Sequence, residues 1–314
     1  MSSPIFGKTM ATVAVAAVIT GTAVAPAMAQ NQHGRAKADT AAVVELATST
    51  TGVVTGTGSG SSAVVTSGRS QVTVPTTARD KVSVSSEGYT IGIGVPESAG
   101  TATAKVAPSG TVVYEAANGN AAAVQPLQDG VRVLAVAGDS KAKEFRFPLN
   151  LPRGAHLDLA PDGSVAVNVD AAEGIRAEIA SFEAPWAKDA HGKPVPTQYR
   201  VEGSTLVQSV DTNSSTAFPV VADPKMTWGW VTGTLYFNRA ETQKATFGAG
   251  AIASIIGSIP LPDWVKVAMG GYMTGIIYQA NVAYSGGNCL KLKLVPPSMI
   301  LPQVYSNSDN SYCA

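Results

Sequence analysis

Alternation of apolar and polar residues dominates the middle of the chain. Segments such as "QVTV", "KVSV" and "GVRVLAVA" place an apolar residue at every second position, which is the period of a half-buried β-strand. Asn118-Gly119 and Pro161-Asp162-Gly163 lie between such segments, and each favours a tight turn. Turn signals recur about every 8–12 residues, and no segment with a helical period interrupts them between Ser70 and Asp223; this is typical of an antiparallel sandwich or barrel. We therefore predict a mainly β, sandwich-like domain over residues 69–224.

A different pattern occupies the first 29 residues. One base, Lys8, precedes an apolar run over residues 10–25, and Ala27-Met28-Ala29 provides a small-x-small site. This order of features is typical of a secretory signal peptide, and the run is too short and too rich in alanine for a membrane anchor. We expect cleavage after Ala29 and a secreted, extracellular protein that begins at Gln30 and can associate with the cell envelope.

Residues 30–68 connect the signal peptide to the predicted β domain. The stretch "TGVVTGTGSGSSAVVTSG" contains few large apolar side chains, so it cannot bury enough surface to offset the entropy of ordering its backbone. We therefore predict a flexible spacer, in which Ser62–Thr66 can form an edge strand.

The pattern changes again at Asp223-Pro224, where we place a domain boundary. Trp228–Phe237 alternates and predicts one strand. Asn238 then stands three residues before Glu241, the spacing of a helix N-cap and its capping-box partner. Helices and a late strand, "NCLKLKLV", complete the pattern. We predict a small α+β domain over residues 225–314.

Two helices of that domain, over residues 239–258 and 263–284, form a predicted hairpin. The second has no charged residue between Val267 and Leu290, and a helix that is apolar all round is either buried or in a membrane. Glycines recur in both helices and allow close approach in a core or a bilayer. The favoured interpretation is a hairpin docked on its own sheet with Ile276 in the core, and the alternative is a membrane-active hairpin.

Two tryptophans follow the predicted boundary closely. Trp228 and Trp230 are two residues apart, so on a strand they point to the same face. They can cover a core, which is the favoured interpretation. The alternative is an aromatic platform on which a sugar or another ligand stacks.

Composition and cysteine usage narrow the class of protein. The chain is 45% hydrophobic and 14% charged, which indicates a globular protein. Its formal net charge is zero, which argues against a nucleic-acid partner. Cys289 and Cys313 are the two cysteines, and an even number in an exported chain favours one disulfide.

A longer motif extends across the end of the predicted β domain. The segment "APWAKDAHGKPVPTQYRVEGSTLVQSVD", followed by "FPVVADP", resembles a stretch common in exported proteins of high-GC Gram-positive bacteria. A similar stretch precedes the repeat arrays of some wall-associated Rhs-type proteins. The resemblance covers residues 155–230 and reaches the tail through "CLKLK" and "YC". It implies an exported β-rich module and carries no catalytic residues.

Motifs for metal or cofactor chemistry are absent from the sequence. His33, His156 and His191 are not spaced with other ligands as a zinc site requires, and neither a GxSxG nor an HExxH motif occurs. We therefore predict no catalytic residue, metal or cofactor. Asp158 and Asp162 match no EF-hand loop, and the Pro-Asp-Gly setting of Asp162 favours a turn role.

Four further carboxylates leave one enzymatic alternative open. A pair of acids at a suitable separation can hydrolyse a glycosidic bond. The candidates follow one another along the chain: Glu173, Glu178, Glu183 and Asp189.

The favoured functional prediction is a non-enzymatic, surface-binding or effector-presenting module. Its expected partners are a cell-wall polymer, another envelope protein or a membrane surface. One alternative is a membrane-perturbing effector, of bacteriocin-like or toxin-like type, that acts through the helix pair. The other alternative is an extracellular polysaccharide hydrolase.

The predicted signal peptide and the predicted disulfide can both be tested on the mature chain. We expect its N-terminus at Gln30 because the signal peptide is removed after Ala29. We also expect its mass to be two protons below that of the dithiol. N-terminal sequencing and intact mass spectrometry without reduction check both points, and two free thiols in the exported protein would contradict the disulfide.

Overall fold

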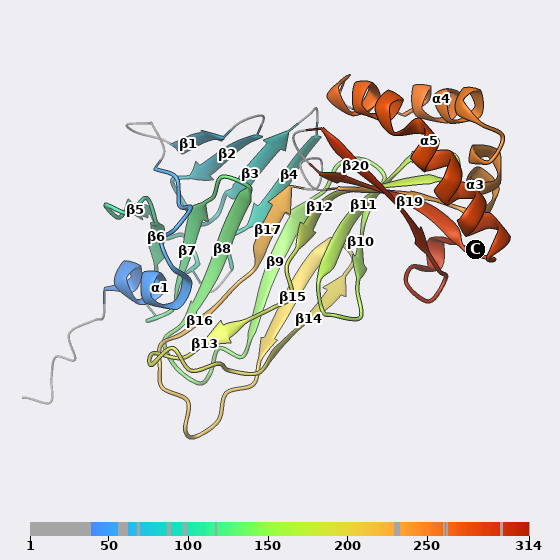
Figure 1. Ribbon diagram of the computed structural model, residues 1–314. Coiled ribbons are helices and arrows are strands. Elements are labelled where there is room, and N and C mark those ends of the chain that lie inside the picture. Colours follow the sequence, from blue (N-terminus) through green and yellow to red (C-terminus); the bar gives the residue numbers. More distant parts are fainter. Residues whose placement is uncertain are drawn as a thin grey trace, which may run out of the picture. The chain divides into compact units, whose positions relative to one another are not determined.

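The computed structural model describes residues 39–55, 62–67, 70–86, 89–96, 99–116, 118–228, 233–259, 261, 263–295 and 298–313. Their strands form two antiparallel sheets, and helices near the C-terminus are followed by two further strands (Figure 1). The predicted fold class, mainly β with a C-terminal α+β part, is confirmed. The predicted signal peptide, its predicted cleavage site after Ala29, and Trp230 lie outside the described residues.

The smaller sheet combines early strands with a later hairpin. In spatial order it contains β1 (Ser62–Ser67), β2 (Ser70–Pro75), β3 (Lys81–Ser86), β4 (Tyr89–Gly94), β9 (Glu144–Asn150), β15 (Thr205–Val210) and β14 (Thr197–Glu202). The edge strand expected at Ser62–Thr66 is therefore confirmed as β1.

The larger sheet contains strands that lie between Ala104 and Tyr305 in the sequence. Its main path is β20 (Met299–Tyr305), β19 (Cys289–Val295), β18 (Thr234–Phe237), β12 (Ile175–Phe182), β17 (Lys225–Trp228), β8 (Gly130–Ala137), β7 (Ala121–Pro126), β6 (Val112–Glu115) and β5 (Ala104–Val106). Four strands lie off this path. β10 (Ala155–Leu159) pairs with β11 (Val165–Ala172), which pairs with β12; β13 (Ala187–Lys188) pairs with β16 (Val220–Ala222), which pairs with β8.

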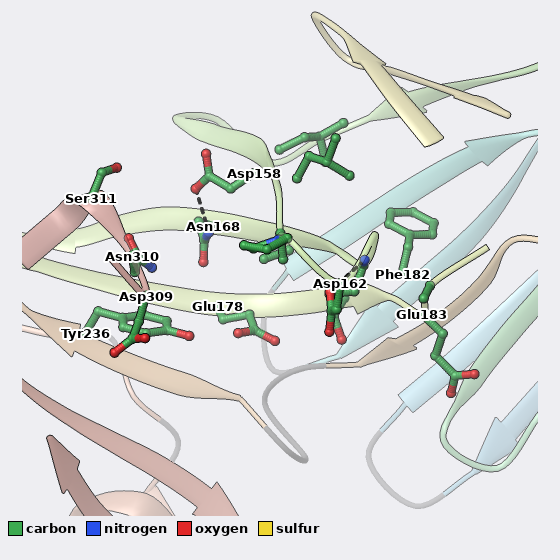
Figure 2. Close-up of a pocket in the computed structure, with 18 of the residues that line it drawn as sticks. Asp158, Asp162, Asn168, Glu178, Phe182, Glu183, Tyr236, Asp309, Asn310 and Ser311 are labelled. Carbon is green, nitrogen blue, oxygen red and sulfur yellow. Dashed lines mark hydrogen bonds between the residues drawn. The ribbon is translucent and has the colours of Figure 1, made fainter. Parts of the chain in front are cut away.

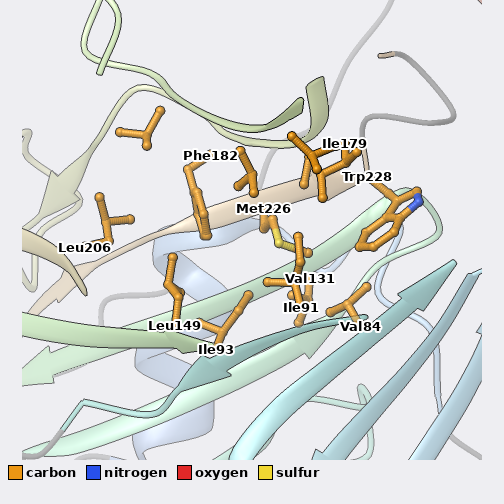
Figure 3. Close-up of a cluster of buried hydrophobic side chains, with 14 of the residues drawn as sticks. Val84, Ile91, Ile93, Val131, Leu149, Ile179, Phe182, Leu206, Met226 and Trp228 are labelled. Atoms are coloured by element: carbon orange, nitrogen blue, oxygen red, sulfur yellow. The ribbon is translucent and has the colours of Figure 1, made fainter. Parts of the chain in front are cut away.

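The main core lies between the two sheets. Figure 3 shows Val84 and Ile91 of the smaller sheet directed toward Phe182, Met226 and Trp228 of the larger sheet. These side chains are at most 1% exposed. Alternation of apolar and polar residues along the strands therefore produces the sandwich, because each inner face presents every second residue to the other sheet.

Strand β12 joins the parts of the chain that the sequence analysis separated at Pro224. It pairs along one edge with both β17 and β18. The single strand expected over Trp228–Phe237 is therefore wrong, since Trp228 ends β17 and Thr234 begins β18. Strands from both sides of Pro224 complete one sheet, and Ala38–Ala314 forms one compact unit. The predicted boundary does not divide the fold.

Part of the predicted spacer is ordered. Helix α1 (Thr40–Thr48) is capped by Asp39, whose carboxylate accepts a hydrogen bond from the backbone of Ala41 at 3.0 Å. Val44 and Ala47 are buried against β6, β7 and β16. The flexible-spacer prediction is thus wrong for this helix, which is docked by its apolar face and by hydrogen bonds such as that from Lys188 Nζ to the carbonyl oxygen of Ala47 at 2.7 Å.

The first predicted C-terminal helix is divided in two. Asn238 caps α3 (Arg239–Ala245) and accepts a hydrogen bond from the backbone of Glu241 at 2.9 Å, as its position predicts. Gly248 has a φ of +108°, which is outside the helical range, so the helix is interrupted here and α4 (Ala249–Gly257) begins after it. A residue with a side chain is strained at this φ, whereas glycine is not. A longer helix, α5 (Asp263–Ser285), follows.

Helix α5 packs on β19 and β20 (Figure 1). Ile276 faces this contact and is fully buried, which agrees with the favoured interpretation of the helix as part of the core. The glycines are not at a close helix contact, however: a side-chain Cβ at Gly270 or Gly271 would meet no atom within 4 Å. In the described part of the chain, no helix has the length and apolarity needed to cross a bilayer.

The burial pattern of α5 predicts different effects for an aspartate introduced at two positions of this helix. Ile276→Asp places a charge in the core and should lower the free energy of unfolding by roughly 3 kcal/mol or more. Val267→Asp is the matched control, because Val267 is 79% exposed and its replacement should change stability by less than about 0.5 kcal/mol. Urea unfolding measures both, and equal losses would contradict the packing of α5.

Candidate functional site

One face of β12 and its neighbours points away from the core. Ile175 and Ala177 are buried in the core, whereas Arg176 and Glu178 alternate to the other face. Tyr236 of β18 pairs with Arg176 in the register of the two strands. A polar sheet surface therefore extends from β10 through β11 and β12 to β18.

A β-bulge shapes this surface. Ile179 is the extra residue between the pairs Asn168–Glu178 and Val167–Ala180 of β11 and β12. Ile179 and Ala180 are consequently both buried. Bulges redirect side chains and occur often beside functional sites, and here the bulge lies next to Asn168 and Glu178.

The chain returns over one end of the polar surface after β20. The predicted disulfide is confirmed, with Cys289 and Cys313 joined and their Cα atoms 5.6 Å apart. It ties a short 3₁₀ helix, η2 (Ser311–Cys313), to the start of β19. Tyr305 at the end of β20 packs edge-on against Tyr236, with ring centroids 5.3 Å apart. The disulfide thus holds residues 306–313 beside the sheet.

Arg176 fastens the same tail to the sheet. Its guanidinium carbon lies 4.2 Å from the ring centroid of Tyr312, a cation–π contact. It also pairs with Asp170 at 3.2 Å and lies 3.6 Å from Asp158. The tail is therefore positioned by both a covalent bond and a charged side chain.

An open cleft of about 730 Å³ lies between this tail and β10–β12 (Figure 2). Its described lining contains no lysine or arginine. Amide and hydroxyl side chains of asparagine and serine make up much of the rest, with Tyr236 as the aromatic residue besides Phe182. The lining carboxylates come from β10, β12 and three loops: Asp158, Asp162, Glu178, Glu183 and Asp309.

Asp162 and Asp309, two of these carboxylates, stabilise the turns in which they lie. Asp162 accepts hydrogen bonds from the hydroxyl and backbone of Ser164, at 2.6 and 2.9 Å, and these bonds lower its pKa. Its predicted turn role is confirmed. Asp309 accepts from the backbone and hydroxyl of Ser306, both at 2.8 Å, and its pKa is lowered for the same reason.

Glu178 differs from the other carboxylates of the cleft. Burial disfavours its charged form and raises its pKa to about 7, against the opposing effects of Lys293 and the hydroxyl of Tyr236. Figure 2 shows the Tyr236 hydroxyl directed toward Glu178. Near neutral pH this group therefore exchanges between a proton donor and a charged acceptor.

The other predicted candidates are dispersed. Trp228 is 1% exposed in the core, so the ligand-stacking alternative is wrong for this residue. Of the four acids considered for hydrolysis, Glu178 and Glu183 share the cleft, whereas Glu173 lines a separate groove beside α3 and α4. Asp189 is buried and binds backbone N–H groups of its own loop.

Asp223 is a second carboxyl group whose pKa is strongly raised by burial, and it lies between the sheets. Its Oδ1 accepts hydrogen bonds from the backbone of Trp186 at 2.9 Å and from Gln208 at 3.2 Å. Tyr199 faces the carboxyl from β14 but lies outside hydrogen-bond geometry. Gln208 belongs to β15 of the smaller sheet, so this bond links the two sheets inside the core.

The fold and the cleft define a two-sheet β protein with an open polar groove, one wall of which is a disulfide-bound tail. No protein-family model matches the chain, and no curated protein is similar to it in sequence. Within the described residues, no group of three or more histidine, cysteine, aspartate or glutamate side chains is placed to hold a metal ion.

Burial of Asp223 predicts a pH-dependent stability. Burial raises its pKa from 3.8 to about 7, so the folded protein binds more protons than the unfolded chain between these values. The free energy of unfolding should therefore fall as the pH rises from about 4 to about 7, by an amount on the order of 3 kcal/mol for this group. Asp223→Asn removes this titration and should reduce the slope, while the part due to Glu178, whose pKa is also raised to about 7, remains. Chemical unfolding at a series of pH values measures the slope of both proteins.

Asp189→Asn is the matched control for this experiment. Burial alone would raise the pKa of Asp189, but backbone N–H bonds from Lys193 and His191 lower it below its ordinary value. Its pH-dependent contribution is thus lost only in acid, below the window of Asp223. A slope that is the same in the wild type and in Asp223→Asn would contradict the assignment.

Proposed function

We propose that the protein is an exported, non-enzymatic module that binds a polymer of the cell envelope in the cleft between its C-terminal tail and β10–β12. The signal-peptide pattern ending at Ala29 supports export, as does the disulfide, which persists in oxidising compartments. The membrane-perturbing alternative stays a prediction for the helix pair.

The observation that carries the proposal is the construction of the cleft. A site that is open, lined by hydrogen-bonding side chains and bordered by Tyr236 suits a long polar chain. Its wall is fixed by the disulfide and by the contact of Arg176 with Tyr312. A wall that is held in place in advance reduces the ordering cost of binding.

A substitution that fills the cleft tests this proposal. Ala166 of β11 lines the cleft, and Ala166→Tyr should abolish retention of the protein on purified insoluble cell-wall material. Ala251→Tyr is the matched control, since Ala251 lines the groove beside α4. Co-sedimentation measures both variants, after circular dichroism has shown that they fold. Equal retention of the wild type and of Ala166→Tyr would contradict binding in the cleft.

A second candidate function, hydrolysis of an extracellular polysaccharide, is favoured by the environment of Glu178. A glycosidase needs one protonated and one ionised carboxyl group, and the raised pKa of Glu178 contrasts with the lowered pKa of Asp162 in the same cleft. The co-sedimentation samples provide the check. Release of reducing ends by the wild type that is lost in Glu178→Gln would favour hydrolysis over binding alone.

A further inference from the structure

We infer that the cleft recognises a glycan that carries primary ammonium groups, and that Asn168 and Glu178 together hold one of these groups. The inference rests on the proposed function, because it names the class of polymer that the same site takes. It is drawn from the hydrogen-bonding capacity of the side chains in the cleft.

Asn168 carries a buried acceptor without a partner. Its side chain is 1% exposed, and its Nδ2 donates to Asp158 at 2.8 Å. A carboxylate only accepts, so this bond fixes the orientation of the amide and turns its oxygen away from Asp158. That oxygen, Oδ1, has no hydrogen-bond partner among the described residues.

Asn168 lines the cleft, and its free oxygen is buried at the base of the cleft. Figure 2 shows the amide between Asp158 and Glu178, and Asn168 pairs directly with Glu178 across the two strands. A buried acceptor left unpaired is costly, by roughly 1–3 kcal/mol. A ligand that donates a hydrogen bond at this point removes that cost.

The charged groups around the cleft favour a cationic donor. The described lining offers carboxylates but no lysine or arginine. Nearby cations already have partners: Arg176 pairs with Asp170 at 3.2 Å and with Asp158 at 3.6 Å, and Lys225 pairs with the lining residue Glu183 at 2.7 Å. An ammonium group has three donors and no acceptor, so it can bond to Asn168 Oδ1 and to Glu178 at the same time. Lys291 and Lys293 act on Glu178 only electrostatically, and they leave its carboxylate available.

A glycan fits the remaining lining better than a peptide does. Each sugar hydroxyl donates as well as accepts and can bond to further carboxylates of the cleft, such as that of Asp158. A peptide unit brings one N–H donor together with a carbonyl group that only accepts, whereas every hydroxyl of a sugar can donate to the acceptor-rich cleft. The ring of Tyr236 and the exposed Leu159 at the rim also offer apolar surface to a sugar face.

Calorimetric titration of the mature chain with two matched sugars tests the inference. The probes are a glucosamine tetramer and its N-acetylated counterpart, which differ only in the amino groups. We expect the wild type to bind the glucosamine tetramer about tenfold more tightly, the scale of one charge-assisted hydrogen bond. Glu178→Gln should remove most of this preference. Glu173→Gln is the matched control, because Glu173 is exposed in the separate groove, and it should keep the preference.

The outcomes separate this inference from the proposed function. Equal binding of the two tetramers, or a preference that survives in Glu178→Gln, overturns the ammonium site but leaves glycan binding in place. A lysine tetramer that binds as tightly as the glucosamine tetramer overturns the assignment to a glycan. If neither sugar binds and cell-wall material is also not retained, both the inference and the proposed function fail.

Discussion

The candidate site depends on how strand β12 is paired. Its first edge is occupied by β11, and its second edge is shared by β17 and β18. Through β18 the strand acquires Tyr236 beside Glu178, and through β19 it acquires Cys289, to which the tail is tied. The floor and the wall of the cleft therefore come from opposite sides of Pro224 in sequence. The C-terminal part of the chain is not an attached module, because without it the cleft has no wall.

The motif on which the sequence resemblance rests has a structural explanation. Trp186, Asp189, Gln208 and Asp223 all fall within its quoted segments. Gln208 and Asp223 join the two sheets, and Asp189 orders its loop through backbone N–H groups. A buried polar group is tolerated where its partners satisfy it, and removing one partner is costly. The polar residues of the two quoted segments therefore hold the sandwich together. The cleft residues Asn168 and Glu178 lie before these segments, within the wider range of the resemblance, residues 155–230.

Periodicity was sufficient to predict most strands but not their partners. β8 begins at Gly130 and ends at Ala137 as expected, because alternate burial leaves a clear trace in the sequence. The pairing of β12 with both β17 and β18 leaves no such trace in the sequence. The predicted domain boundary at Pro224 was wrong for this reason. In the site, Glu178 was among the candidate acids, but Asn168 was not. Asn168 lies beside Glu178 next to a bulge at Ile179, which shifts the alternation of inward and outward side chains along β12 by one residue. The bulge has no signal in the sequence.

Hydrogen exchange of the mature protein, with and without the glucosamine tetramer, tests the central claim most directly. The claim is that the ligand site lies between the disulfide-bound tail and β10–β12. We predict that the ligand slows exchange in residues 307–311 and in the turn at Asp162–Ser164, the two sides of the cleft. Exchange on the exposed face of α5, around Tyr278, should stay unchanged. Protection confined to α5, or an unchanged rate at both sides of the cleft under saturating ligand, would contradict the account.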